Sequence, residues 1–315
     1  MPALPSLRQL SYLVELAERL NFREAAEAQF VTQSTLSAGI KELETQLGVQ
    51  LVERDRRTVR LTAVGEEVVM RARGLLAAAF DLVDSARSAV RPLSGPLRLG
   101  TIPTIAPFLL PAVLPPLRRA YPGLKLYLRE DLTERILERL RAGSLDVALI
   151  ALPYDTDDLH VQPLFKDEFW FVAPENDPAA QAKEIAVRKV DPADVLLLEE
   201  GHCLRSHAIA ACGPRRGWEP KLEATSLYTL IQMVEGGMGV TLLPEITLKA
   251  GILKSTHLIA RPFAAPAPSR TLALAARPTS PRLGDVALLA DFMIEHHSRA
   301  GRPGIPAVRR HQPRA

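Results

Sequence analysis

Hydrophobic residues in the first 50 positions recur at helical spacing and define two faces. The faces comprise Leu7, Leu10, Val14, Ala17 and Leu20, and then Leu36, Ile40, Leu43 and Leu47. Between them, Asn21 followed three residues later by Glu24 is typical of a helix start. Thr32 is placed to cap the following helix and Gly48 to end it. The pattern predicts three helices, of which the last two are joined by a tight turn.

The outer face of the third predicted helix is polar, which leaves two interpretations open. It presents Gln33, Ser34, Thr35, Ser37 and Lys41 near the helix start. In a helix-turn-helix protein, such residues enter the major groove and contact base edges or phosphates. In an ordinary helical hairpin, the same residues are merely solvated.

The next segment favours DNA binding. Apolar residues at 49, 51, 59 and 61 bracket ERDRR, which predicts a small hairpin with arginines around its tip. This hairpin would be a wing that holds phosphates through Arg54, Arg56, Arg57 and Arg60.

A long apolar stripe follows the predicted wing. Thr62 is placed to cap a helix that runs to about Val90. Its stripe comprises Val64, Val68, Leu75, Ala79, Leu82, Ala86 and Val90. The spacing suits a partner helix, as in a coiled coil, although a helix packed on its own domain gives the same stripe.

Strand-like and helix-like segments alternate from residue 97 to about 301, which predicts an α/β domain with a mostly parallel sheet. We expect the chain to pass from a first lobe to a second near residue 166 and to return near 268. Such a pair of lobes resembles the periplasmic binding proteins, which close around a ligand.

These segments define the expected domains. Residues 1–62 form an all-α winged helix-turn-helix DNA-binding domain, and 63–91 form a linker and dimerisation helix. Residues 92–301 form a regulatory α/β domain of two Rossmann-like lobes, with lobe I at 92–166 and 269–301 and lobe II at 167–268. Residues 302–315 form a basic tail that we expect to be disordered.

Net charge gives no argument for nucleic-acid binding. The value of +3 depends on the last 17 residues, which hold five arginines and no acid, whereas residues 1–91 hold 12 basic and 12 acidic residues. Only local basic patches support DNA as a partner.

Composition and missing motifs narrow the function further. The uncharged stretch 99–117 is long enough to span a membrane, but five prolines interrupt it, and the first residues lack a signal-peptide pattern. Two cysteines are too few for a secreted disulfide framework. We therefore expect a cytoplasmic protein without membrane contact. No phosphate-binding loop or nucleophile elbow is present, so we expect no enzyme and no cofactor.

The segment AAEAQFVTQSTLSAGIKELETQLGVQLVERDRRTVRLTAVG resembles the winged helix-turn-helix of the LysR-type transcriptional regulators. Its alanine run and the pieces QSTLS, IKELE, LGVQLVER and LTAVG all fall at the family's spacing, and GMGVTLLP matches a later segment. The resemblance implies promoter DNA and RNA polymerase as partners, a dimerising linker helix and a homotetramer.

Both cysteines lie in GHCLRSHAIAACG, residues 201–213, and four interpretations fit the residues alone. If 203–212 is a helix, the two Cα atoms lie about 13.5 Å apart. A disulfide needs about 4.4 to 6.8 Å, so oxidation would unwind the helix and act as a redox switch. The cysteines would otherwise be inert and buried, or bystanders while an effector binds between the lobes, or metal ligands. A zinc or copper site would comprise His202, Cys203, His207 and Cys212.

The segment EEGHCLRSHAIAAC resembles the redox segment of the peroxide-sensing members of the LysR-type family, and similar segments extend to about residue 301. The resemblance implies that Cys203 is the peroxidatic residue and Cys212 the resolving residue. It also implies that Thr104 and Thr133 bind hydrogen peroxide, while His202 and Arg205 flank the reactive sulfur. Helix capping would explain both threonines equally well. Ser206 departs from the family pattern, because an acidic residue is expected there.

Overall fold

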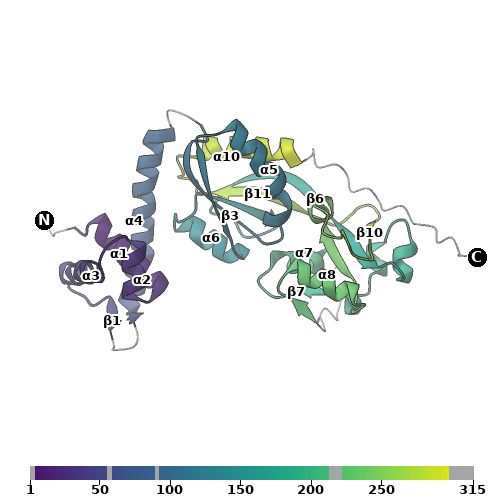
Figure 1. Cartoon of the computed structure of the whole chain (residues 1–315), viewed down its shortest axis with the longest axis horizontal. Helices are drawn as coiled ribbons and strands as arrows, with labels where there is room; N and C mark the ends of the chain where they lie inside the picture. Colours follow the sequence, from purple (N-terminus) through teal and green to yellow (C-terminus); the bar gives the residue numbers. More distant parts are fainter. Residues whose placement is uncertain (1–3, 55–58, 89–91, 213–221, 298–315) are drawn as a thin grey trace, which may run out of the picture. The chain divides into compact units, whose positions relative to one another are not determined.

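The computed structural model describes residues 4–54, 59–88, 92–212 and 222–297 (Figure 1). Arg56, Arg57, Val90 and the basic tail therefore lie outside the described residues, as do the side chains of Arg54, Ala86 and Cys212. The chain divides into two compact units, residues 1–91 with 138–145 and residues 92–137 with 146–315.

The described residues among 1–91 form four helices and a short hairpin. These elements are α1 (Leu7–Arg19), α2 (Phe22–Ala28), α3 (Gln33–Leu47), β1 (Val52–Arg54), β2 (Val59–Leu61) and α4 (Ala63–Ser88). The predicted caps are confirmed, because Asn21, Thr32 and Thr62 each accept a backbone N–H of the following helix. Gly48 ends α3 in the left-handed conformation. Strands β1 and β2 pair antiparallel, which places the ends of the predicted wing side by side.

The core of the N-terminal unit differs in part from the predicted faces. Leu36, Ile40 and Leu43 are buried as predicted, but Leu47 is exposed. On α1 the buried residues are Gln9, Leu10, Tyr12, Leu13 and Leu16, whereas Leu7 and Leu20 are exposed. The α1 face was therefore predicted wrongly at both ends. A Cβ at Gly39 would approach the Tyr12 ring to 2.8 Å, so glycine lets α3 pack closely on α1.

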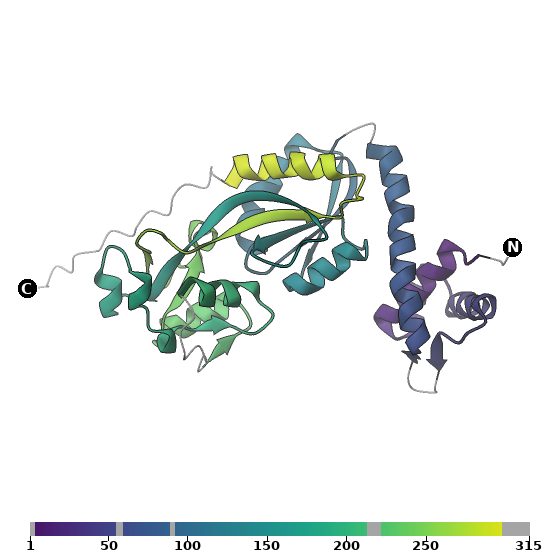
Figure 2. The same cartoon turned by 180° about the vertical axis from the view of Figure 1, so that it is seen from behind.

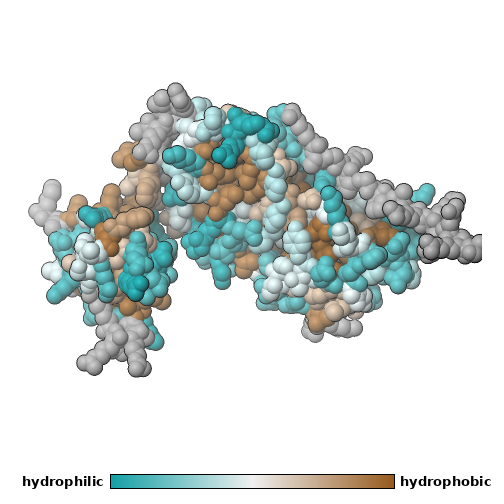
Figure 3. Space-filling model, in the orientation of Figure 1, coloured by the Kyte–Doolittle hydropathy of each residue, from teal (hydrophilic) through white to brown (hydrophobic). Residues whose placement is uncertain are grey.

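Helix α4 carries two apolar faces with different surroundings. Val69 and Ala72 are buried in the core of the N-terminal unit. The predicted stripe is instead largely solvated, since Leu75 and Leu82 are 58% and 73% exposed. Figure 3 shows the hydrophobic surface along this helix.

The C-terminal unit is built on a seven-stranded sheet of order β10-β6-β11-β5-β3-β4, with β9 also paired to β6. Its strands are β3 (Gly95–Thr101), β4 (Leu124–Glu130), β5 (Val147–Leu152), β6 (His160–Pro174), β9 (Thr241–Pro244), β10 (Leu258–Pro262) and β11 (Ser269–Ala276). A second, two-stranded sheet pairs β7 (Leu197–Leu198) with β8 (Glu223–Ala224). The hydrophobic pattern did not predict β10.

Helices cover both faces of the first half of this sheet (Figures 1 and 2). Helices α5 (Ala106–Ala120) and α10 (Leu283–His297) lie on one face and α6 (Thr133–Arg141) on the other. The second half carries α7 (Cys203–Cys212), α8 (Leu227–Glu235), α9 (Glu245–Lys249) and the short 3-10 helices η1 (Pro178–Gln181), η2 (Val187–Lys189) and η3 (Pro192–Asp194).

The large sheet is mixed, so the prediction of a mostly parallel sheet was wrong. Strand β3 pairs parallel with β4 and β5, but β6 and β11 pair antiparallel with each other and with their other neighbours. The long strand β6 pairs with β11 up to Glu168 and with β9 from Phe169 onward. The chain therefore passes between the two halves of the sheet where Asp167 and Arg270 face each other across β6 and β11.

No helix within the described residues is long and apolar enough to cross a membrane. The uncharged stretch at 99–117 instead forms the end of β3 and most of α5, which tolerates Pro111, Pro115 and Pro116 within the helix.

Candidate functional site

Cys203 is the first residue of α7, and its side chain is only 6% exposed. Helix α7 extends through Cys212, so nine residues of helix separate the two cysteines by about 13.5 Å. That separation exceeds the roughly 4.4 to 6.8 Å between the Cα atoms of a disulfide. In this conformation of the chain, Cys203 cannot be bonded to Cys212.

A small cavity adjoins Cys203, and in this conformation it is too narrow to admit a water molecule. It is lined by Ile102, Pro103, Thr104, Leu132, Thr133, Gly201, His202 and Cys203, so the loops after β3 and β4 meet the start of α7 there. Gly201 has φ +92°, and a Cβ at this position would lie 2.9 Å from Leu132 Cδ1. Leu132 therefore packs directly over the turn that precedes the cysteine, and the positive φ of Gly201 favours glycine at this turn.

Thr104 is buried and held by Arg270. The guanidinium donates from Nη1 to Thr104 Oγ1 at 2.9 Å and from Nη2 to Thr104 O at 3.1 Å. Arg270 Nε donates to Asp167 Oδ2 at 3.0 Å, and the Ile246 amide donates to Asp167 Oδ1. Burial raises the pKa of Asp167, while Arg270 and the Ile246 amide oppose that rise.

Thr133 is equally buried, but its hydroxyl has no hydrogen-bond partner among the described residues. It lines the same cavity as Thr104 and Cys203. The structure thus brings both predicted threonines to the predicted cysteine. One hydroxyl accepts from Arg270, and the other retains its full capacity to donate and accept.

His202 also lines the cavity and is buried. Burial lowers its pKa, with Glu199 at 3.9 Å opposing, so the ring is neutral near pH 7. His202 therefore supplies a polar ring beside the cysteine rather than a positive charge.

Arg205 is not among the residues that line the cavity. Its Nη1 donates to Leu198 O at 3.2 Å and forms an ion pair with Glu223. These contacts attach α7 to the β7–β8 sheet. Arg205 was predicted to flank the reactive sulfur. In this conformation it instead anchors α7 to the β7–β8 sheet.

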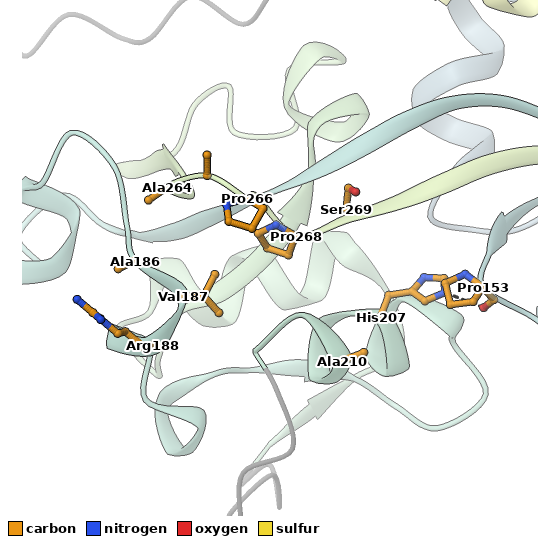
Figure 4. Close-up of a pocket in the computed structure, with 11 residues that line it drawn as sticks. Pro153, Ala186, Val187, Arg188, His207, Ala210, Ala264, Pro266, Pro268 and Ser269 are labelled. Carbon is orange, nitrogen blue, oxygen red and sulfur yellow. Dashed lines mark hydrogen bonds between the residues drawn. The ribbon is translucent and has the colours of Figure 1, made fainter.

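A second, larger cavity of about 670 Å³ lies against another part of α7 (Figure 4). Its lining includes His207 and Ala210 of α7, Pro153 after β5, Val187 of η2 and Pro268 before β11. His207 Nε2 donates to Pro153 O at 3.1 Å, since a proline carbonyl only accepts. Burial lowers the pKa of His207, and Arg270 lowers it further.

The four predicted metal ligands are not assembled as a site by the described side chains. Among these residues, no three His, Cys, Asp or Glu side chains are grouped closely enough to hold an ion. His202 lines the small cavity, whereas His207 lines the large one and uses Nε2 for Pro153.

The predicted DNA-reading residues lie at the start of α3. Gln33, Ser34, Thr35 and Lys41 are exposed there, and Ser37 is half-buried. The Thr32 hydroxyl contacts the hydroxyls of Ser34 and Thr35 at 2.9 and 2.8 Å. The helix start therefore presents a linked row of hydroxyl groups to solvent.

Asp167 and Arg270 are the site residues that sequence reasoning missed. Arg270 is the second residue of β11, and Asp167 lies midway along β6, two residues before the apolar run FWFVAP. Such positions are commonly solvated, so the pattern gives no signal that these two charges face each other inside the protein.

Comparison with protein-family models gives two matches. The LysR substrate binding domain matches residues 91–298. The model described as the bacterial regulatory helix-turn-helix protein, lysR family, matches residues 7–66. The helix-turn-helix interpretation and the predicted fold class, a two-lobed α/β domain preceded by a DNA-binding head, are confirmed.

Two curated relatives span most of the chain. The HTH-type transcriptional regulator EstR of Acinetobacter baylyi is 48% identical over 295 residues, 93% of this chain and 97% of the relative. The hydrogen peroxide-inducible genes activator of Dickeya chrysanthemi is 39% identical over 292 residues, 92% of this chain and 95% of the relative.

Two solved structures also cover nearly the whole chain. A full-length OxyR variant from Pseudomonas aeruginosa has a TM-score of 0.79 at 36% identity, covering 96% of this chain and 98% of that one. A cysteine variant of OxyR from Corynebacterium glutamicum with hydrogen peroxide bound has a TM-score of 0.65 at 32% identity, covering 95% of each chain.

Proposed function

The chain belongs to the LysR family of bacterial regulatory proteins, and we propose that it controls transcription in response to hydrogen peroxide, which it senses at Cys203. The observation that carries this proposal is the cavity where a buried cysteine meets two threonine hydroxyls, one of them without a partner among the described residues. The names of the Dickeya relative and the peroxide-bound OxyR structure support the same signal.

The first chemical step oxidises the cysteine. The Cys203 sulfur attacks one peroxide oxygen, an S–O bond forms and the O–O bond breaks. The second oxygen leaves with the bonding electrons, takes up the thiol proton and departs as water. The sulfur loses two electrons and becomes a sulfenic acid.

The second step forms the disulfide. The Cys212 sulfur attacks the sulfenic sulfur, and the hydroxyl group leaves as water with the Cys212 thiol proton. Because α7 holds the two Cα atoms about 13.5 Å apart, this step requires the helix to unwind. The unwinding converts a local oxidation into a change of shape in lobe II.

The protein carries out its response by binding DNA. Helix α3 enters the major groove with Gln33, Ser34, Thr35, Ser37 and Lys41, and the wing holds phosphates with Arg54, Arg56 and Arg57. The solvated apolar face of α4 pairs with the same helix of a second subunit, and two such dimers form a tetramer. The protein acts on promoters through RNA polymerase as a regulator rather than as an enzyme.

Mass analysis of the protein after one equivalent of hydrogen peroxide tests the switch. We expect a peptide that links Cys203 to Cys212 in the wild type. Cys203→Ser should lose both the crosslink and the transcriptional response while retaining basal DNA binding. Cys212→Ser should accumulate the sulfenic acid. Free thiols in the oxidised wild type, or a normal response from Cys203→Ser, would contradict the proposed function.

A second candidate function rests on the larger cavity. Its 670 Å³ falls within the range of small-molecule sites, and its walls are mostly alanine, proline and valine. The name of the EstR relative mentions no peroxide. A regulator that binds a small organic effector there would respond to that effector equally well with Cys203 replaced by serine.

A further inference from the structure

Asp167 and Arg270 form an ion pair whose side chains are completely shielded from solvent. They face each other across β6 and β11, where the chain passes between the two halves of the large sheet. A buried ion pair is generally no more stabilising than a well-packed apolar pair. Its presence at this point is better explained by the groups that it orients.

The Asp167–Arg270 pair joins strands β6 and β11 to helix α9 and to the loop after β3. Asp167 accepts from the Ile246 amide of α9 through Oδ1 and from Arg270 Nε through Oδ2. The rigid, planar guanidinium leaves its two terminal nitrogens facing Thr104, and they donate to the hydroxyl oxygen and the carbonyl oxygen of that residue. Asp167 thereby fixes the plane of the guanidinium, and the guanidinium fixes Thr104.

This arrangement determines the direction of the Thr104 hydroxyl. A threonine hydroxyl has one proton to donate, and its oxygen here already accepts from Arg270 at 2.9 Å. The proton must therefore point away from the guanidinium. Thr104 lines the cavity that adjoins Cys203, so a ligand that enters when this cavity widens meets Thr104 as a donor. The Thr133 hydroxyl has no partner among the described residues, so it is able either to donate to the ligand or to accept from it.

We propose that Asp167 is a positioning residue for the oxidation of Cys203 by hydrogen peroxide, acting through Arg270 to make Thr104 a donor to the leaving oxygen. The inference rests on the proposed function. As the S–O bond forms and the O–O bond breaks, negative charge develops on the oxygen that leaves as water. A donor already aimed at that oxygen stabilises the charge without reorganising.

The test compares two reactions of the same sulfur in the full-length protein. Asp167→Asn should slow oxidation of Cys203 by hydrogen peroxide about tenfold or more, as expected for a misaligned donor to a developing charge. Alkylation by iodoacetamide should change less than about twofold, because iodide leaves without needing a hydrogen bond. Equal losses in both reactions would indicate a merely structural role and overturn the proposal, as would an unchanged rate with peroxide.

A double-mutant cycle then locates the effect. Thr104→Val removes the donor, so adding Asp167→Asn to it should cause no further loss of the peroxide rate. Independent, multiplying losses would overturn the route through Thr104. Thr104→Ser, which retains the hydroxyl, should react within about threefold of the wild type.

A second variant keeps the test valid if the first one is unstable. If Asp167→Asn does not fold, Arg270→Lys replaces it, since an ammonium keeps the charge opposite Asp167 but cannot reproduce the planar fork. The same selective loss of the peroxide rate is expected, and an unchanged rate overturns the proposal.

A wild type that reacts with peroxide no faster than free cysteine overturns the proposed function and this inference together. A fast wild type with an equally fast Asp167→Asn overturns this inference alone.

Discussion

Thr133 places a buried hydroxyl where the described residues offer it no hydrogen bond. An unsatisfied buried polar group costs about 1–3 kcal/mol of stability, and native proteins contain few of them. A valine of nearly the same shape would avoid that cost. The hydroxyl is therefore better explained by a ligand that enters when the cavity widens than by the stability of the fold.

Replacing Thr133 with valine should separate stability from sensing. We expect Thr133→Val to raise the free energy of unfolding by about 1 kcal/mol, measured by chemical denaturation, because the unsatisfied hydroxyl is gone. The rate at which hydrogen peroxide oxidises Cys203 should fall in the same variant. Thr133→Ser serves as the control that keeps the hydroxyl. A valine variant that is less stable, or that is oxidised at the wild-type rate, would refute the assignment.

His207 makes stability depend on pH. Burial holds the pKa of this histidine below its ordinary value of 6.5, so the folded protein keeps the ring neutral while the unfolded chain takes up a proton. The unfolded state thus binds more protons below pH 6.5, and stability falls as the pH drops from there toward the folded pKa. The lowered pKa values of His202 and His297 act in the same direction.

His207→Gln should weaken this pH dependence, because glutamine retains an N–H for Pro153 O but does not titrate. The thermal unfolding midpoint measured between about pH 5.5 and 7.5 should fall less in the variant than in the wild type. His257→Gln, at an exposed histidine that pairs with Glu235, is the matched control. An identical pH slope in wild type and His207→Gln would argue against the buried, neutral ring.

Helix α7 is the element that separates the two cysteines, so its helical stability opposes disulfide formation. Ala210 is exposed near the end of this helix, and glycine there costs about 1 kcal/mol of helix stability. Ala210→Gly should therefore speed conversion of the sulfenic acid to the disulfide by up to about fivefold. Formation of the sulfenic acid itself should be unchanged.

Rapid-quench mass analysis measures both steps. Ala112→Gly in α5, also at an exposed helical position, is the matched control and should leave both rates unchanged. If Ala210→Gly forms the disulfide no faster than Ala112→Gly, unwinding of α7 does not limit the reaction.

The elements that sequence reasoning placed correctly are those with local causes. The starts of α2, α3 and α4 follow from Asn21, Thr32 and Thr62, whose side chains bond to backbone only two or three residues away. The buried face of α1 depends instead on where α3 and α4 pack against it. A period of 3.6 residues fits several neighbouring faces, so Leu13 and Leu16 were missed while Leu7 and Leu20 were included.

In the candidate site, too, features carried by a short segment of sequence were predicted, whereas long-range contacts were not. Segment resemblance identified Cys203, Thr104, Thr133 and His202, and the structure gathers these four around one cavity. Asp167 and Arg270 were not predicted, because their contact joins strands more than 100 positions apart. The mixed sheet escaped prediction for a similar reason. The direction in which β11 returns beside β5 is set by tertiary pairing, not by its own pattern.

At the scale of the whole molecule, α4 exposes an apolar face that a monomer would leave in water. Leu75 and Leu82 lie seven positions apart on this face, the spacing of one heptad, and both are mostly exposed. Exposed apolar surface of this kind marks an interaction site. Burial of the two leucines against a second α4 would explain why the predicted stripe does not pack within its own unit.

Leu75→Glu combined with Leu82→Glu should therefore break the α4 contact and reduce the size of the assembly, since both charges would be buried at the helix pair. Sedimentation velocity gives the size, and affinity for a two-site operator should fall with it. Leu4→Glu, which alters an exposed leucine ahead of α1, should leave the assembly intact. A doubly substituted protein of unchanged size would exclude α4 as the dimer contact.

The helix between the two cysteines also bears on how the signal ends. Because α7 must unwind when the proposed disulfide forms, the folding free energy of this helix favours the reduced form with two free thiols. For a two-electron couple, each 1.4 kcal/mol corresponds to about 30 mV, so a helix that refolds on reduction makes the reduction potential less negative. The disulfide should thus be reduced more readily by cellular thiols than an unstrained structural disulfide. Helix stability in α7 would then set both the threshold of the response and its duration.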